Sequence, residues 1–263
     1  MDSFERLMAD IRANVPSQSI NTLSHSFWIL RASPFGHHLS KYFSEMLGTY
    51  VLVFVGPGSI IVSASLGLPW PETLLIVATT FGGTVALVIL ALGRFSGAHI
   101  NPAITIGSTF AGSFDSGLML PYVVFQIAGA ILAGISLRIT LGTIEPLAYL
   151  GSTELAPGVT TLEGTVLEVI GTFILTLSAL VASSYVKSPL RKAALVGGTL
   201  LVLILFIGPL TGASFNPARS LGPSVFSGYF SDQFVYYIGP LCGAAIAGLT
   251  FRQVRTSIGK RFE

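Results

Sequence analysis

Charged residues are scarce in this chain of 263 residues: Asp, Glu, Lys and Arg make up 10% of it, against 51% hydrophobic residues. An ordinary soluble domain carries roughly 25% charged residues, so the composition argues against a soluble fold and favours a lipid-embedded one. The net charge of +2 is too small to indicate a nucleic-acid partner.

Cysteines and clustered reactive groups are also scarce. Cys242 is the only cysteine, which rules out a disulfide within the chain. The pair His37-His38 is one hint of a metal, but such a site usually needs three or four ligands, so we expect no metal and no cofactor. No Ser-His-Asp or metal-ligand cluster gathers in the sequence, which makes an enzyme the least favoured class. The first 20 residues are too charged for a secretory signal.

Long apolar segments are what the chain has in abundance. A membrane-spanning helix needs about 20 mostly apolar residues, and six segments meet this need. They cover approximately residues 41–65, 72–93, 118–140, 163–186, 193–210 and 233–252. We therefore expect an all-α, multi-pass membrane protein in contact with the lipid bilayer.

The positive residues predict how these spans are oriented. With six spans both termini lie on one side of the membrane, and that side receives twelve of the fourteen Lys and Arg residues. Arg138 and Arg219 are left for the other side. Because positive residues favour the cytoplasmic side, we expect both termini in the cytoplasm and a location in the cell membrane.

The chain also repeats itself. Three landmarks recur in the same order, which defines two halves near residues 41–140 and 163–252. The landmarks are Glu-x-x-Gly-Thr at 45–49 and 168–172, a Gly-Ala-x-x-Asn-Pro-Ala segment ending at 103 and 218, and Gly-Ala at 129–130 and 243–244. Each half holds three spans, an odd number, so the second half is inverted, as in many transport proteins.

Outside the repeated region, 41–252, lie a cytoplasmic N-terminal extension, 1–40, and a cytoplasmic tail, 253–263. Apolar residues of the extension fall on one helical face, which is compatible with an interfacial helix or with a partly ordered tail. These residues are Phe4, Leu7, Met8, Ile11 and Val15.

Two identical triplets, Asn101-Pro102-Ala103 and Asn216-Pro217-Ala218, occupy matching positions in the halves. Asn is a favoured N-cap and Pro is favoured at the first helical position, so each triplet predicts a helix start. The apolar stretch behind each is too short to span the hydrocarbon. We expect two re-entrant half-helices entering from opposite faces, with their Asn caps meeting at the middle.

This geometry predicts a water pore. Two helix N-termini aim partial positive charge at the centre, and the amides of Asn101 and Asn216 can both donate to a passing water. The hydrogens of that water then point away from the centre, which interrupts proton hopping, and the helix ends repel cations. Backbone carbonyls of the unwound segments would line the water file, from Gly97, Ala98, His99, Gly212, Ala213 and Ser214.

These motifs resemble the aquaporin, or major intrinsic protein, family. The resemblance rests on both triplets, Ser-Gly-Ala-His before the first, Arg-Ser-Leu-Gly-Pro after the second and the Glu-x-x-Gly-Thr openings, and it covers roughly residues 41–252. It implies an aquaporin-like fold of six transmembrane helices and two half-helices, one pore per subunit, and a homotetramer. It also implies that Glu45 and Glu168 hydrogen-bond the re-entrant loops, although an interfacial position is an alternative for such acids.

The resemblance further implies a narrow selectivity filter formed by Phe81, Ile204, Ala213 and Arg219. The alternatives are lipid or core packing for Phe81 and Ile204, and an interfacial position for the arginine. Strict water channels of this family typically have Phe, His, Cys and Arg at the four filter positions. The resemblance therefore implies that the filter of this chain is wider and more apolar than theirs. It looks like archaeal aquaporins and, more loosely, nodulin-26-like members, which are associated with water and small neutral solutes such as glycerol.

Other positions favour water alone. Glycerol channels tend to have Asp after the filter arginine, where this chain has Ser220, and they lack a pair like Tyr236-Tyr237. We therefore predict a passive channel for water, with passage of glycerol or other small neutral solutes as a further hypothesis and a glycerol facilitator as an alternative. A secondary transporter also uses inverted repeats, but it would place ionisable groups along its path. A structural membrane protein would have a closed pore.

Overall fold

The computed structural model describes residues 38–142 and 149–259. This part of the chain forms α4 (Leu39–Ser65), α5 (Trp70–Ser96), α6 (Pro102–Phe110), α7 (Ser116–Leu141), the 3-10 turn η2 (Tyr149–Gly151), α8 (Thr161–Tyr185), α9 (Pro189–Thr211), α10 (Pro217–Ser227) and α11 (Val235–Gly259). The chain divides at Tyr42 into two units, and all packing described below lies in the second. The expectations for the apolar face between Phe4 and Val15, for His37 and for residues 260–263 concern positions outside the described residues.

Six of these helices correspond to the six predicted spans. By length and composition, α4, α5, α7, α8 and α9 are long and apolar enough to cross a membrane. The sixth, α11, is as long as α8, with 25 residues, but it does not meet the same hydropathy criterion. Its first turns carry Tyr236 and Tyr237 and its last turns carry Arg252 and Arg255. It also continues past residue 252, because no helix-breaking residue occurs before Gly259.

The outward surfaces of these helices are apolar. Ile139 on α7 and Phe206 on α9 are 77% and 76% exposed, and Ile238 and Leu249 of α11 are also exposed. Large apolar side chains that face outward along the whole length of a helix are suited to lipid rather than to water.

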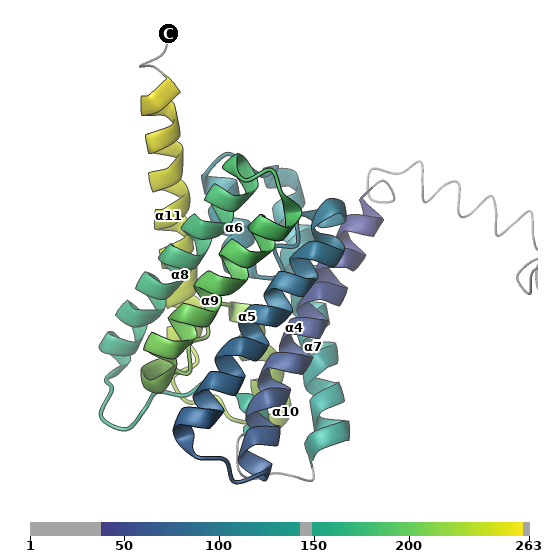
Figure 1. Cartoon of the computed structure of the whole chain (residues 1–263), viewed down its shortest axis with the longest axis vertical. Helices are drawn as coiled ribbons and strands as arrows, with labels where there is room; N and C mark the ends of the chain where they lie inside the picture. Colours follow the sequence, from purple (N-terminus) through teal and green to yellow (C-terminus); the bar gives the residue numbers. More distant parts are fainter. Residues whose placement is uncertain (1–37, 143–148, 260–263) are drawn as a thin grey trace, which may run out of the picture. The chain divides into compact units, whose positions relative to one another are not determined.

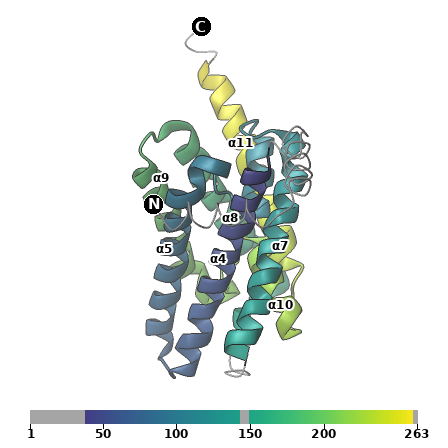
Figure 2. The ribbon, with the colours of Figure 1, turned by 90° about the vertical axis from the view of Figure 1, so that its right-hand side faces the viewer.

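The helix order shows the two inverted halves. Each half runs long, long, short, long: α4 to α7 and then α8 to α11. The short helices α6 and α10 lie toward opposite ends of the bundle (Figure 1). Each packs against the last long helix of the other half, α6 against α11 and α10 against α7, and Figure 2 shows α10 beside α7. The halves are therefore interlocked through their short helices.

Glycines allow the long helices to approach closely. Gly82 of α5 faces Gly197 of α9, and a Cβ at either would collide with the carbonyl oxygen of the other. In the same way Gly129 lies against the Met46 carbonyl and Gly243 against that of Val169. Small residues at helix interfaces are the usual means by which membrane helices gain close backbone contact.

Candidate functional site

Both short helices begin at the predicted triplets. Pro102 and Pro217 are their first residues, and Asn101 and Asn216 are the N-caps. The Asn101 side-chain oxygen accepts from the Ala103 N–H at 2.8 Å, and the Asn216 oxygen accepts from the Ala218 N–H at 3.0 Å. The helices have 9 and 11 residues, or roughly 14 and 17 Å at 1.5 Å per residue. Neither can cross a hydrocarbon layer of about 30 Å.

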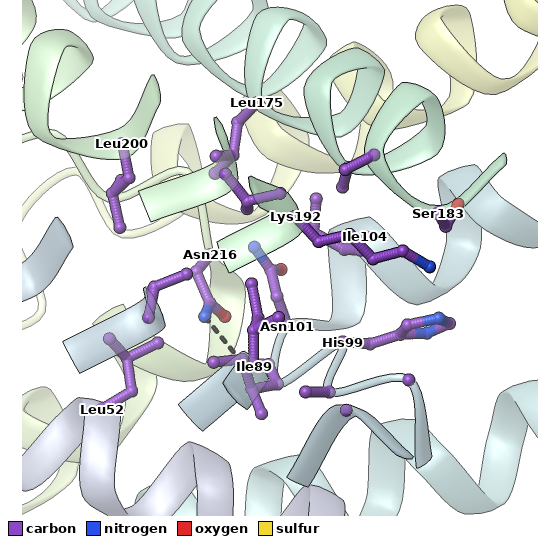
Figure 3. A pocket seen from close by; sticks show the side chains of 18 of the residues that line it. Leu52, Ile89, His99, Asn101, Ile104, Leu175, Ser183, Lys192, Leu200 and Asn216 are labelled. Atoms are coloured by element: carbon purple, nitrogen blue, oxygen red, sulfur yellow. Dashed lines mark hydrogen bonds between the residues drawn. The ribbon is translucent and has the colours of Figure 1, made fainter. Parts of the chain in front are cut away.

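The two asparagines come together at the centre of the site. The Asn101 amide donates to the Phe215 carbonyl at 2.8 Å, and the Asn216 amide donates to the Ile100 carbonyl at 3.0 Å. Figure 3 shows both side chains in the same stretch of one pocket. Since an amide group has two N–H donors, each asparagine keeps one that these bonds do not use.

Two buried glutamates hold the loops that precede the triplets. Glu45 accepts from the His99 and Ile100 N–H groups at 3.0 and 2.6 Å. Glu168 accepts from the N–H groups of Ser214 and Phe215 at 3.0 and 2.7 Å. Both glutamates are fully buried, with 0% exposure, so they lie inside the helix bundle rather than at an interface.

The loops have an unusual backbone that these bonds help to fix. Gly97 and Gly212 are left-handed, with φ of 90° and 73°. Non-glycine residues are left-handed as well, with φ of 49° at Ala98, 47° at Ile100, 45° at Ala213 and 54° at Phe215. Such residues cost about 1–3 kcal/mol each and persist where the surroundings over-determine them.

The same loop geometry leaves backbone carbonyl oxygens of the two loops without a protein donor. The N–H of Ala98 donates to the Ser96 hydroxyl and the N–H of Ala213 to the Thr211 hydroxyl, so consecutive N–H groups of each loop are bound on the protein side. Among the described residues, no protein donor reaches the carbonyls of the six residues predicted to line the water file. Five of them, Gly97, Ala98, His99, Ala213 and Ser214, line one cavity, and Gly212 lines a second.

These two cavities share a lining residue, Arg219. The first has a volume of about 400 Å³ and reaches from Arg94, Lys187 and Lys192 past both asparagines to Arg219. Its charged lining residues, among those described, are all basic, and the rest of its wall is largely apolar, with Leu52, Leu175 and Leu200 (Figure 3). The second has a volume of about 510 Å³. Of the described lining residues, only Arg219 belongs to both.

Each of the four residues predicted for the filter lines at least one of these cavities. Phe81 and Ala213 line the first cavity, Ile204 lines the second, and all four side chains are buried. The Arg219 guanidinium lies 5.0 Å from the centre of the Phe81 ring, and its Nη1 donates to the Gly151 carbonyl at 2.8 Å. Its Nε has no hydrogen-bond partner among the described residues.

Sequence reasoning missed several residues of this site. Gln126 donates to Glu45 at 2.7 Å and to the Thr105 hydroxyl at 2.9 Å; an amide inside an apolar span could have indicated it. The same Thr105 hydroxyl lies 3.2 Å from Nδ1 of His99. Gly151, which holds Arg219, carries no signal in the sequence, because it lies in the irregular segment between the halves.

Comparison with known proteins agrees with this architecture. The model of the major intrinsic protein family matches residues 32–251. The chain is 34% identical over 225 residues to aquaporin NIP1-1 of Zea mays, covering 82% of this chain and 75% of that protein. It is 33% identical over 224 residues to aquaporin Z of Bradyrhizobium diazoefficiens, covering 81% and 92%.

A solved structure shares the fold. The aquaglyceroporin from Plasmodium falciparum superposes with a TM-score of 0.72 at 26% identity, covering 82% of this chain and 94% of that one. The two capped half-helices, and the two cavities that both have Arg219 in their lining, agree with this match. The chain belongs to the major intrinsic protein family, as a multi-pass membrane protein that forms a passive channel for water and small solutes.

Proposed function

We propose that this channel passes water in single file, admits small uncharged solutes such as glycerol, and excludes protons and ions. The observation that carries the proposal is the reciprocal bonding of Asn101 and Asn216 at two helix N-termini that line one cavity. The remaining N–H groups of the two asparagines then act as two aligned donors at the centre of a passage whose wall is largely apolar.

Proton exclusion follows from these donors. Each asparagine directs its remaining N–H toward the passage, so a water at the centre accepts two hydrogen bonds. Both of its own hydrogens then point outward along the file, and no proton can be relayed through it. The N-terminal ends of α6 and α10 add partial positive charge at this point, and the basic lining of the first cavity further disfavours cations.

On either side, carbonyls and the constriction guide the permeant. In this proposal the carbonyls of Gly97, Ala98, His99, Gly212, Ala213 and Ser214 accept hydrogen bonds from permeating molecules. Phe81, Ile204, Ala213 and Arg219 form the selectivity filter. The unpartnered Arg219 Nε donates to the oxygen of water or of an alcohol, while its charge repels cations.

The composition of the filter supports a solute range wider than water. Ile204 brings an aliphatic wall and Ala213 leaves space beside the guanidinium, which suits the carbon chain of a small polyol. The similarity to an aquaglyceroporin of known structure supports the same conclusion. Ser220 and the tyrosines of α11 are the features that favour water alone, so the main role as a glycerol facilitator is the less supported alternative.

We place the channel in the cell membrane as a homotetramer, with residues 41–252 as the channel domain and residues 1–40 and 253–263 in the cytoplasm. Arg94, Lys187 and Lys192 then lie at the cytoplasmic mouth, in accord with the distribution of positive charge. The apolar outward faces of the helices would supply both lipid contacts and subunit contacts.

Paired permeability measurements test this proposal. The protein is reconstituted in liposomes, and water and glycerol fluxes are followed by stopped-flow light scattering against empty vesicles. We expect both fluxes to exceed the background. Ile204→His should lower the glycerol flux more than the water flux, because a larger polar ring narrows the filter, whereas the matched variant Ile204→Val should not.

The outcomes separate the alternatives. Glycerol flux no faster than that of empty vesicles would remove the solute part of the proposal, and absence of water flux would remove all of it. A saturable flux that depends on an ion gradient would indicate a secondary transporter instead.

A further inference from the structure

A buried chain of hydroxyl groups lies directly behind the constriction. The Ser220 hydroxyl accepts from the Thr153 hydroxyl at 2.9 Å and lies 2.6 Å from the Ser214 hydroxyl. Ser214 in turn donates to the Asn216 carbonyl at 3.0 Å. Thr153 and Ser220 are 0% exposed and Ser214 is 4% exposed, so water cannot readily replace these bonds.

The number of hydroxyl hydrogens fixes the direction of donation along these hydrogen bonds. Each hydroxyl has a single hydrogen to donate. Thr153 uses its hydrogen on Ser220, and Ser214 uses its hydrogen on the Asn216 carbonyl. Ser220 must therefore donate to Ser214, and every hydroxyl of the chain depends on its neighbour.

The first half has a similar set of hydrogen bonds at the matching positions, but its outermost partner is different. Thr105, four residues after Asn101 as Ser220 is after Asn216, also contacts the residue two before its asparagine, His99. Its further partner is Gln126 of α7, within the helix bundle. In the second half that partner is Thr153, in the segment between the halves. The half that has Thr153 as this partner is also the half that carries Arg219.

Each of the three hydroxyl residues is close in sequence to a residue of the predicted filter or to the residue that holds Arg219. Ser220 follows Arg219 on the first turn of α10, and Ser214 follows Ala213. Thr153 lies two residues after Gly151, whose carbonyl holds the Arg219 guanidinium. The Ser220 hydroxyl thus joins the three backbone segments that carry Arg219, Ala213 and the Gly151 carbonyl.

We propose that Ser220, with Thr153, is a positioning residue that sets the width of the filter and hence the limit on solute size. This inference rests on the proposed function, because it assigns the determinant of selectivity at the same pore. Ser220 is fully buried and touches no permeating molecule. It acts through Arg219, Ala213 and the Gly151 carbonyl.

Loss of either hydroxyl should loosen the constriction. Thr153→Val removes the hydroxyl at nearly constant volume, and Ser220→Ala removes the central one. We expect both to raise the ratio of glycerol to water permeability about two- to five-fold in liposomes, with water flux per channel changed less than two-fold. Thr153→Ser keeps the hydroxyl and should keep the ratio of the parent protein. Combining Thr153→Val with Ser220→Ala should add little, since both break one chain.

A matched control breaks a different hydroxyl contact between α10 and the connecting segment. Ser227, on the last turn of α10, lies 3.1 Å from the hydroxyl of Ser152. Ser227→Ala removes that contact but leaves the Thr153–Ser220–Ser214 bonds intact, and Ser152 keeps its contact with Ser224, so the ratio should stay unchanged. Thermal unfolding in detergent is measured on every variant, because a purely structural role would lower the midpoint without changing the ratio.

The inference is overturned if Thr153→Val reconstitutes and keeps the parent ratio, or if Ser227→Ala raises the ratio equally. If Ser220→Ala does not fold, Thr153→Val and Thr153→Ser still decide the question. Failure of the proposed function would be visible in the parent protein alone, which would then pass no water. Should the parent pass water but no glycerol, the ratio is measured with urea, and the same expectations hold.

Discussion

Asn101 and Asn216 each bind the backbone of the other half: the amide of one donates to the carbonyl that precedes the other, at 2.8 and 3.0 Å. Both side chains also cap their own helices. The same two residues therefore connect the halves and, in the proposed function, shape the centre of the passage, so the proposal links stability and conduction at this point.

Replacing either amide by a carboxylate tests that link. Asn216→Asp removes the donor to Ile100 and places an oxygen opposite a carbonyl oxygen. Leaving a buried group unsatisfied costs about 1–3 kcal/mol, and more for a charge, so we expect a lower unfolding midpoint in detergent and a lower water flux. Asn101→Asp should behave alike. Unchanged stability and flux in both variants would contradict a structural role for the reciprocal bonds.

Replacing the buried Glu168 by glutamine should destabilise the protein. Glu168 accepts three bonds, from Thr211, Ser214 and Phe215, and the nitrogen of a glutamine would face one of those donors. Since a hydrogen bond to a charged group contributes about 1.5–3 kcal/mol, Glu168→Gln should destabilise the protein and reduce water flux. Glu163→Gln on the same helix is the control, because glutamine also fits its capping box. Equal effects of the two substitutions would refute the expectation.

The α5–α9 contact is expected to reject even one methyl group. A Cβ at Gly197 would meet the Gly82 carbonyl and, at 2.9 Å, the Ala86 side chain, whereas one at the neighbouring Gly198 meets no described atom within 4 Å. Overpacking of this kind costs about 1–3 kcal/mol. Gly197→Ala should therefore lower the thermal midpoint while Gly198→Ala should not. A reversed order would show that the helices are held apart by other contacts.

Gly151 offers a way to disturb Arg219 without replacing it. Its φ is 70°, and an added Cβ would meet Pro57 at 2.7 Å. Gly151→Ala should shift the carbonyl that holds the guanidinium and raise the glycerol-to-water permeability ratio. Gly158→Ala shares the left-handed backbone, with φ of 89°, but meets no described atom within 4 Å. An altered ratio in Gly158→Ala alone would exclude the proposed cause.

The helices and the helix starts could be predicted because they depend on local features. The apolar segments predicted every long helix, and the Asn-Pro pairs predicted the first residues of α6 and α10. Both features depend on short motifs or on periodicity along the chain. The selectivity filter of Phe81, Ile204, Ala213 and Arg219 comes from the family resemblance alone and stays a prediction.

Other parts depend on contacts between distant segments, which a single sequence does not record. Ile100 and Phe215 in the unwound loops are left-handed although neither is glycine, and Glu45 and Glu168, far away in the sequence, bind their N–H groups. The Thr153–Ser220 bond joins residues 67 positions apart. Neither residue type nor spacing marks such a pair before the fold is known.

In the proposed function the two cavities act as conduits in series, so the narrowest segment between them limits the flux. Wall residues such as Leu175 and Leu200, which line only the first cavity, can then vary in shape at small cost to that flux. Conductance depends instead on the position of one side chain, Arg219, the one described residue that lines both cavities, and substitutions among the few groups that hold it are the direct route to altered selectivity.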